Sequence, residues 1–118
     1  MRIILPLPPT DNRLRVSARY SGRLVNTSQY RSWLSKSEEL WFWKYSHCIT
    51  PLQADFAHQV KIPYQLFLKD KRSDISNYEK ATKDFLTKRL YDDDKWVSLD
   101  LQLPVEIDKL NPRLEIII

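Results

Sequence analysis

Carboxylate side chains flank a predicted helix in the second half of this chain. Asp74 lies just before the expected start of the helix, and Asp93 and Asp94 lie just after its expected end. Carboxylate oxygens are ligands that Mg²⁺ prefers, and a magnesium site with open positions can hydrolyse a phosphodiester. Solvated helix flanks carry the same pattern, so these acids alone indicate a metal site only weakly.

Two more polar side chains, Asn77 and Lys80, lie on the polar side of the same predicted helix. Asn77 could orient one of the carboxylates or bind a phosphate oxygen. Lys80 could stabilise the charge that develops on the scissile phosphate or on the leaving oxygen. Together with the acids, these residue types suit phosphodiester chemistry.

The helix itself is predicted from its cap and its inner face. Ser76 and Glu79 have the spacing of a capping box, so the helix is expected to run from about residue 77 to about residue 89. Its inner face carries residues at steps of three and four, which are Tyr78, Ala81, Thr82, Phe85 and Leu86.

The composition is that of a globular protein. The chain has 118 residues, of which 42% are hydrophobic and 29% charged, which is enough for one domain with one core. No apolar run approaches the ~20 residues of a membrane span, and the proline-broken start is not expected to be a signal peptide. The single cysteine, Cys48, excludes an intrachain disulfide and favours a reducing, cytoplasmic setting.

Basic residues are concentrated in two segments, although the net charge is only +4. Segregated basic patches beside acidic residues suit a phosphate backbone that approaches a metal. The predicted DNA-binding residues are Arg13, Arg15, Arg19, Arg23, Lys69, Lys71 and Arg72. Arg15, Arg19 and Arg23 fall on a predicted hairpin over residues 14–26, which turns near the only glycine, Gly22, and Arg13 directly precedes it. That hairpin is either a DNA-gripping arm or an ordinary solvated hairpin.

Hydrophobic periodicity predicts the remaining elements. Alternating residues predict strands over 2–7, 58–69, 96–103 and 112–118. Residues 27–49 have helical periodicity, with Thr27 or Ser28 as the cap. The order strand, hairpin, helix, strand, helix, strand, strand predicts one α+β domain over residues 1–118, with two main helices on a mixed sheet.

Two details of these elements carry further expectations. Pro63 predicts that the strand over 58–69 lies at a sheet edge or contains a bulge. Leu40, Phe42 and Trp43 widen the apolar stripe of the first helix beyond what one core face needs. The extra aromatic surface serves either a thick core or contact with another subunit.

The chain resembles the RusA-type Holliday junction resolvases over nearly its whole length. The opening residues 5–13 (LPLPPTDNR) are similar to the first strand, proline pair and asparagine of that family. Residues 71–97 resemble its most specific pattern, a basic run, Asp-x-Asp-Asn, a lysine three residues later and an Asp pair before a strand. On this chain the matching positions are Asp74, Asn77, Lys80, Asp93 and Asp94.

The resemblance implies a homodimeric, Mg²⁺-dependent endonuclease that nicks four-way DNA junctions symmetrically, with Mn²⁺ as an alternative metal. It implies catalytic roles for Asp74, Lys80 and Asp94. It implies metal binding by Asp74, Asp93 and Asp94. The expected partners are branched DNA and a second copy of the chain, with no membrane and no small-molecule cofactor. The expected location is cytoplasmic and nucleoid-associated, with a phage or prophage origin left open.

Ser76 departs from the family pattern, because it replaces the second Asp of Asp-x-Asp-Asn. A neutral hydroxyl is a weaker metal ligand than a carboxylate, so Ser76 and Asn77 are assigned supporting roles only. Asp92 could compensate through a bound water, and retained activity is expected. The alternatives are a junction-binding protein with weak or no cleavage, and an α+β protein-interaction module without a nucleic-acid role.

The length of the predicted helix adds a hypothesis about subunits. A helix of about thirteen residues is ~20 Å long, which separates Asp74 from Asp94 within one chain unless the helix is much shorter or the next loop runs back along it. In a two-fold dimer with antiparallel helices, Asp74 of one subunit would face Asp94 of the other. The sequence therefore predicts a composite site shared between subunits.

Overall fold

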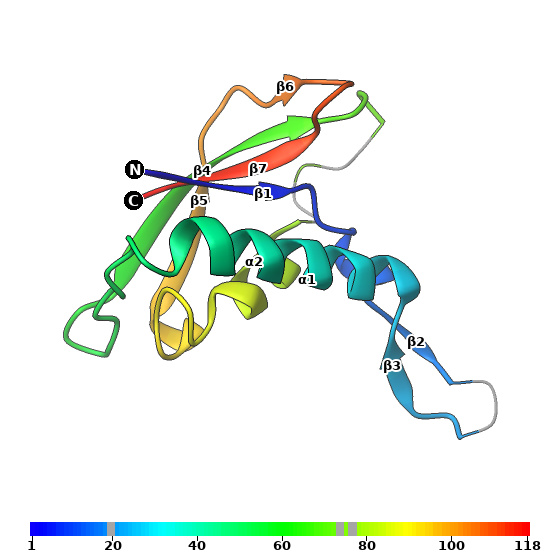
Figure 1. The fold of residues 1–118 in the computed structure, drawn as a ribbon, viewed down its shortest axis with the longest axis horizontal. Coiled ribbons are helices and arrows are strands. Elements are labelled where there is room, and N and C mark those ends of the chain that lie inside the picture. Colours follow the sequence, from blue (N-terminus) through cyan, green and yellow to red (C-terminus); the bar gives the residue numbers. More distant parts are fainter. Residues whose placement is uncertain (19–20, 73–74, 76–77) are drawn as a thin grey trace.

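A computed structural model describes residues 1–18, 21–72, 75 and 78–118. It confirms an α+β domain in which two helices lie on one side of a mixed, five-stranded sheet (Figure 1). The strands of this sheet are β1 (Arg2–Pro6), β4 (Val60–Leu68), β5 (Val97–Leu101), β6 (Glu106–Ile107) and β7 (Arg113–Ile117). In the described part of the chain, no helix combines the length and the apolar character needed to cross a bilayer.

Strand β4 is the centre of the sheet, so the expected edge position of this strand is wrong. It pairs antiparallel with β7, which pairs with the edge strand β1, and parallel with β5 and β6 on its other side. The carbonyl of Tyr64 accepts a hydrogen bond from the amide of Gln102 on the β5 side. Backbone groups of successive strand residues point to opposite neighbours, so the nitrogen of Pro63 faces β7. Pairing with β7 begins only at Tyr64, so the missing N–H costs no bond to that strand.

The expected inward faces are confirmed within the strands, whereas Leu103, which the alternation also placed inward, lies beyond β5 and is 73% exposed. Alternate residues of β4 and β5 are buried, because every second side chain of a strand points toward the helices, and in β7 Glu115 of the other face is buried as well. This core set is Ile62, Tyr64, Leu66, Leu68, Val97, Leu99, Leu114 and Ile116. The strands therefore present one apolar face, and the helices cover it.

The first helix, α1 (Ser28–Leu40), begins as predicted and ends earlier. Thr27 is its cap, since the hydroxyl of Thr27 accepts from the amide of Tyr30 at 3.2 Å. The helix continues as a π-helical turn, η2 (Trp41–Tyr45), and stops there rather than at residue 49. Trp33 and Trp41 face inward and are buried, whereas Phe42 and Trp43 are exposed. The aromatic stripe thus serves the core only in part.

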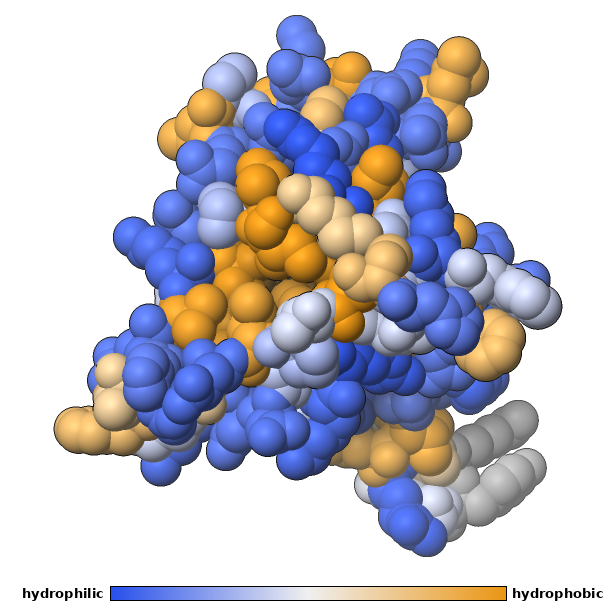
Figure 2. Space-filling view, turned by 60° about the vertical axis from the view of Figure 1, so that its left-hand side comes forward, coloured by the Kyte–Doolittle hydropathy of each residue, from blue (hydrophilic) through white to orange (hydrophobic). Residues whose placement is uncertain are grey.

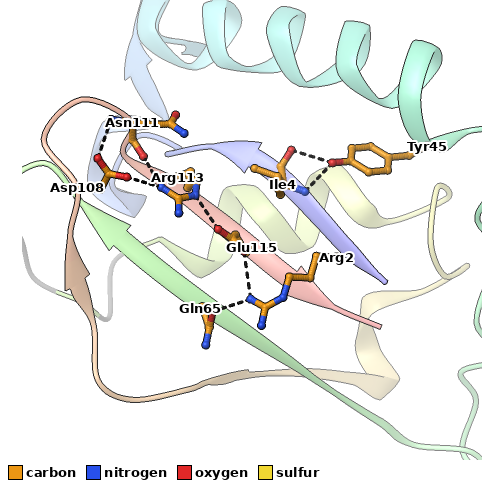
Figure 3. A network of polar contacts seen from close by, with 8 residues as sticks. All are labelled: Arg2, Ile4, Tyr45, Gln65, Asp108, Asn111, Arg113 and Glu115. Carbon is orange, nitrogen blue, oxygen red and sulfur yellow. Dashed lines mark hydrogen bonds and ion pairs between the residues drawn. The ribbon is translucent and has the colours of Figure 1, made fainter.

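Side chains of α1 and η2 also bind the backbone of β1. The amide of Ile4 donates to the Tyr45 hydroxyl at 2.8 Å, and the Trp33 indole N–H donates to the carbonyl of Pro6 at 2.7 Å. Figure 3 shows the Tyr45 contact beside an ion-pair network on the neighbouring strand β7. There Arg113 bonds Glu115 and Asp108, each at 2.6 Å. The Tyr45 and Trp33 contacts fix the helix to β1, and Arg2 of β1 donates to Glu115 of β7 at 3.1 Å.

The predicted hairpin is confirmed as β2 (Arg15–Ser17) and β3 (Leu24–Asn26). It forms a separate two-stranded sheet that projects from the body of the domain (Figure 1). Gly22 has φ +66°, a conformation that glycine adopts without steric cost. Exposed arginines on this hairpin therefore stand clear of the core.

The central helix, α2 (Glu79–Leu86), has eight residues and is shorter than predicted. Tyr78 is its N-cap and makes no side-chain capping hydrogen bond, so the helix starts later than residue 77, where it was predicted to begin. Glu79 is instead the first helical residue, and its carboxylate accepts from the hydroxyl of Tyr64 at 2.7 Å. The other half of the predicted box, Ser76, lies outside the described residues.

The chain turns back after α2. Lys88 has φ +71°, and its amide donates to the carbonyl of Tyr91 at 2.6 Å. The hydroxyl of Tyr91 in turn donates to the carbonyl of Lys83 at 2.9 Å. The turn that leads to the Asp triplet is therefore fixed to the last turn of the helix it follows.

Candidate functional site

Lys80 lies in the first turn of α2, with an exposed side chain. Its backbone amide donates to the carboxylate of Asp11 at 3.3 Å. Asp11 begins the 3-10 turn η1 (Asp11–Arg13), which follows the proline pair. Sequence reasoning missed Asp11, because nothing local in a turn shows that it will reach a helix 69 residues away.

The bond between Tyr64 and Glu79 anchors the start of α2 to the centre of the sheet. Burial is the largest cause that raises the pKa of Tyr64, and the hydrogen bond and charge of Glu79 raise it further. The hydroxyl therefore stays protonated and remains a donor at neutral pH. A fixed helix start gives Lys80 a fixed position.

The two acids of the family pattern differ in environment. Asp93 is exposed and caps the short turn η3 (Asp94–Trp96), because its carboxylate accepts from the amide of Lys95 at 3.0 Å. Asp94 is half-buried, and its negative charge contributes, after burial, to the raised pKa of Tyr91. Since Tyr91 is bonded to Lys83, the structure holds the segment of Asp94 close to α2.

The helix is shorter than the hypothesis of a shared site assumed. An eight-residue helix is ~12 Å long, and the hydroxyl of Tyr91 fixes the segment after it to the last turn of the helix. The residues predicted at the other end, Asp74 and Asn77, lie outside the described residues, so their roles and the shared site stay predictions.

The structure brings two of the predicted DNA-binding residues together. Arg13 and Lys69 line one cleft of about 740 Å³, and Lys36 of α1 lies there with them. Arg15 and Arg23 are exposed on the hairpin, whereas Lys71 and Arg72 are exposed after β4. Arg19 lies outside the described residues. Sequence reasoning missed Lys36, although Ser28, Ser32 and Lys36 recur every four residues along one helix face.

A family model described as endodeoxyribonuclease RusA matches residues 6–118. The chain belongs to the RusA endodeoxyribonuclease family. Among the curated proteins, none matches it. The family assignment confirms the resemblance seen in the opening segment and around α2.

The described residues of this RusA-family chain do not by themselves form a metal site. Within residues 1–18, 21–72, 75 and 78–118, no three His, Cys, Asp or Glu side chains form a group that could hold an ion. Asp94 offers hard carboxylate oxygens that no described residue occupies with a hydrogen bond. RusA-family nucleases typically use a divalent metal, and carboxylate oxygens such as those of Asp94 are ligands that Mg²⁺ prefers.

Proposed function

We propose that this RusA-family protein is a metal-dependent endonuclease that resolves four-way DNA junctions by symmetric nicking, with residues 1–118 as one nuclease domain. One observation carries the proposal: the chain turns at Lys88 and Tyr91 bonds the last turn of α2, so Asp94 is held beside the eight-residue helix whose first turn carries Lys80. The family match over residues 6–118 supports the same chemistry.

Each residue has a distinct role in the proposed reaction. Asp74, Asp93 and Asp94 hold Mg²⁺, or Mn²⁺ in its place, which when bound supplies a Lewis acid for the phosphate oxygens. Lys80 stabilises negative charge on the scissile phosphate. Asn77 orients a carboxylate, and Ser76 contributes a neutral hydroxyl. The bond from Lys80 to Asp11 keeps the helix start in place while the side chain contacts DNA.

Symmetric nicking of opposing strands requires two sites, so the proposal includes a homodimer. Figure 2 shows an apolar area ringed by hydrophilic side chains on the side where both chain ends lie. A groove of about 500 Å³ joins the aromatic Trp43, which is 74% exposed, to Ile4 and Leu5 of β1. Exposed apolar surface of this kind favours a partner. A monomer in sedimentation at assay concentration would count against the proposal.

The decisive experiment is incubation of an end-labelled four-way junction with the protein and Mg²⁺. Paired nicks at symmetric positions on opposing strands support the nuclease. A linear duplex of the same sequence is the control for structure specificity, and chelation of the metal should abolish the nicks. Cutting of the duplex at an equal rate contradicts junction resolution.

A second candidate function is junction binding with weak or no cleavage, which Ser76 favours because it removes one family carboxylate. Tight junction binding without nicks would identify it. A protein-interaction module is a third candidate, and binding that does not change with salt would identify that one, because phosphate contacts weaken steeply as salt rises.

Ser76→Asp restores the family carboxylate and is expected to increase cleavage about tenfold, equivalent to ~1.4 kcal/mol of barrier. A charged ligand should also lower the Mg²⁺ concentration at half-maximal rate. Cleavage rates against Mg²⁺ concentration measure both effects, with Ser76→Ala as the control that removes only the hydroxyl. An aspartate variant no faster than the native chain shows that the missing carboxylate does not limit activity.

The hairpin arginines should bind phosphates. The double substitution Arg15→Ala and Arg23→Ala is expected to weaken junction binding equally on all sequences and to reduce the slope of log K against log salt by about 2. Fluorescence anisotropy at several salt concentrations measures this. Lys61→Ala with Lys109→Ala removes the same charge from exposed sites elsewhere. Equal slopes for the two double variants contradict a DNA-gripping hairpin.

A further inference from the structure

One cleft in this fold has walls from three separate segments. It lies between the loop after β1, one face of α1 and the residues that follow β4, and its volume is about 740 Å³. Two aromatic residues that line it, Trp33 and Tyr78, are nearly fully buried. Its exposed lining residues include Arg13, Lys36 and Lys69, one from each segment.

The charge of this cleft is positive. None of its three cations takes part in an ion pair among the described residues. The acid that lines the cleft, Asp70, accepts a hydrogen bond from the amide of Arg72 at 2.9 Å. A concave surface with excess positive charge focuses the electric field and concentrates anions. The cleft therefore suits a negatively charged ligand.

The other polar groups of the cleft, together with its volume, indicate which kind of anionic ligand fits it. Ser28, Gln29 and Ser32 line the cleft from the first half of α1, and hydroxyl and amide groups commonly bond the phosphates and sugars of DNA. The volume lies within the ~300–1,000 Å³ of sites for small molecules. Such a space admits a short stretch of one strand, whereas a duplex is much wider.

The cleft also lies beside the start of α2. Tyr78 lines it and directly precedes that helix, while Arg13 belongs to the turn whose Asp11 bonds the amide of Lys80. A strand held in the cleft would therefore pass close to Lys80.

We propose that this cleft binds the sugar–phosphate backbone of one strand of the junction and positions that strand for cutting. The inference rests on the proposed nuclease function and adds Lys36 and the serine face of α1 to the DNA-binding surface. Lys36, Lys69 and Arg13 are positioning residues in this scheme, since they bind the strand away from the phosphate that is cut.

The first test compares Lys36→Gln with Lys61→Gln, an equal loss of charge at an exposed lysine of β4 outside the cleft. Junction affinity is measured by anisotropy from low to high salt. Lys36→Gln is expected to weaken binding several-fold and to reduce the salt slope by about 1, because one phosphate contact is lost. Lys61→Gln should leave the slope unchanged.

The second test adds negative charge to the cleft without removing a native cation. Ser32→Glu is compared with Ser32→Gln, which has nearly the same shape and helix propensity. The glutamate variant is expected to bind the junction at least about tenfold more weakly than the glutamine variant, because it repels a phosphate at close range. Circular dichroism checks that both variants fold alike.

The outcomes separate this inference from the proposed function. If Lys36→Gln and Lys61→Gln have equal salt slopes and the two Ser32 variants have equal affinities, the proposal that the cleft binds DNA is wrong. Cleavage of the junction by the native protein would still support the nuclease function. If only the cleft variants change junction affinity and the native protein binds the junction without cutting it, the cleft proposal is supported and the nuclease function is contradicted. A native protein that binds no junction overturns both.

Discussion

Asp94→Asn is expected to reduce junction cleavage by at least about 100-fold, a loss of ~2.7 kcal/mol of transition-state stabilisation. The substitution keeps the size of the side chain and removes the charge that would hold the metal. Asp94 is the half-buried acid of the family pair, so its charge is less screened by water than that of the exposed Asp93. Single-turnover cleavage of a labelled junction at saturating protein measures the loss.

The matched control is Asp84→Asn, which removes an exposed carboxylate from α2 itself. This variant should cut at close to the native rate. Junction affinity without metal should be unchanged or slightly higher for both variants, because each loses negative charge near a polyanion. If Asp94→Asn cuts the junction at a rate within a few-fold of the control rate, Asp94 has no catalytic or metal-binding role.

Phe85→Ala is expected to destabilise the fold by about 3–5 kcal/mol, the usual range for a buried phenylalanine. Phe85 is 1% exposed and joins the two helices. Its ring meets the edge of Trp33 at 5.6 Å between centroids and that of Trp41 at 6.1 Å. Domains have a free energy of unfolding of only about 5–15 kcal/mol, so this substitution removes a large part of it.

Urea unfolding followed by tryptophan fluorescence gives the free energy of unfolding for this comparison. The control is Phe56→Ala, which removes the same side chain from a position that is 75% exposed. A surface change of this kind is expected to cost less than about 1 kcal/mol. If the two variants unfold at the same urea concentration, Phe85 does not hold the helices together.

The sheet and the first helix were predictable because local chemistry decides them. The alternation in 58–69 placed Ile62, Tyr64 and Leu66 inward, and a strand has no other way to bury them. Thr27 was a recognisable cap because its hydroxyl bonds an amide three residues later. The central position of β4 was not predictable, since Pro63 fits inside a sheet only when pairing on one side stops beside it.

The length of α2 was mispredicted for a physical reason. Leu86 and Leu90 are both fully buried at helical spacing, although Leu90 lies beyond the helix. The chain leaves the helix through Lys88, which adopts a positive φ where glycine is the usual stop signal. A pattern that continues without a stop residue reads as a longer helix.

The candidate site shows a similar division between local and long-range information. Lys80, Asp93 and Asp94 could be proposed from sequence because their family pattern lies within one short segment. Asp11 and Lys36 were missed because their importance arises only when separate segments meet. Asp11 meets α2 through the amide of Lys80, and Lys36 meets Arg13 and Lys69 across the cleft.

The contacts of β1 with Tyr45 and Trp33 have a consequence for self-association. β1 is an edge strand, and unpaired backbone groups on such a strand recruit strands from other molecules. Here the Tyr45 hydroxyl occupies the outward amide of Ile4, the indole of Trp33 occupies the carbonyl of Pro6, and Pro6 has no amide to offer. The π-helical turn that carries Tyr45 thus blocks strand addition at the β1 edge of the sheet and leaves side-chain surfaces for any pairing of subunits there.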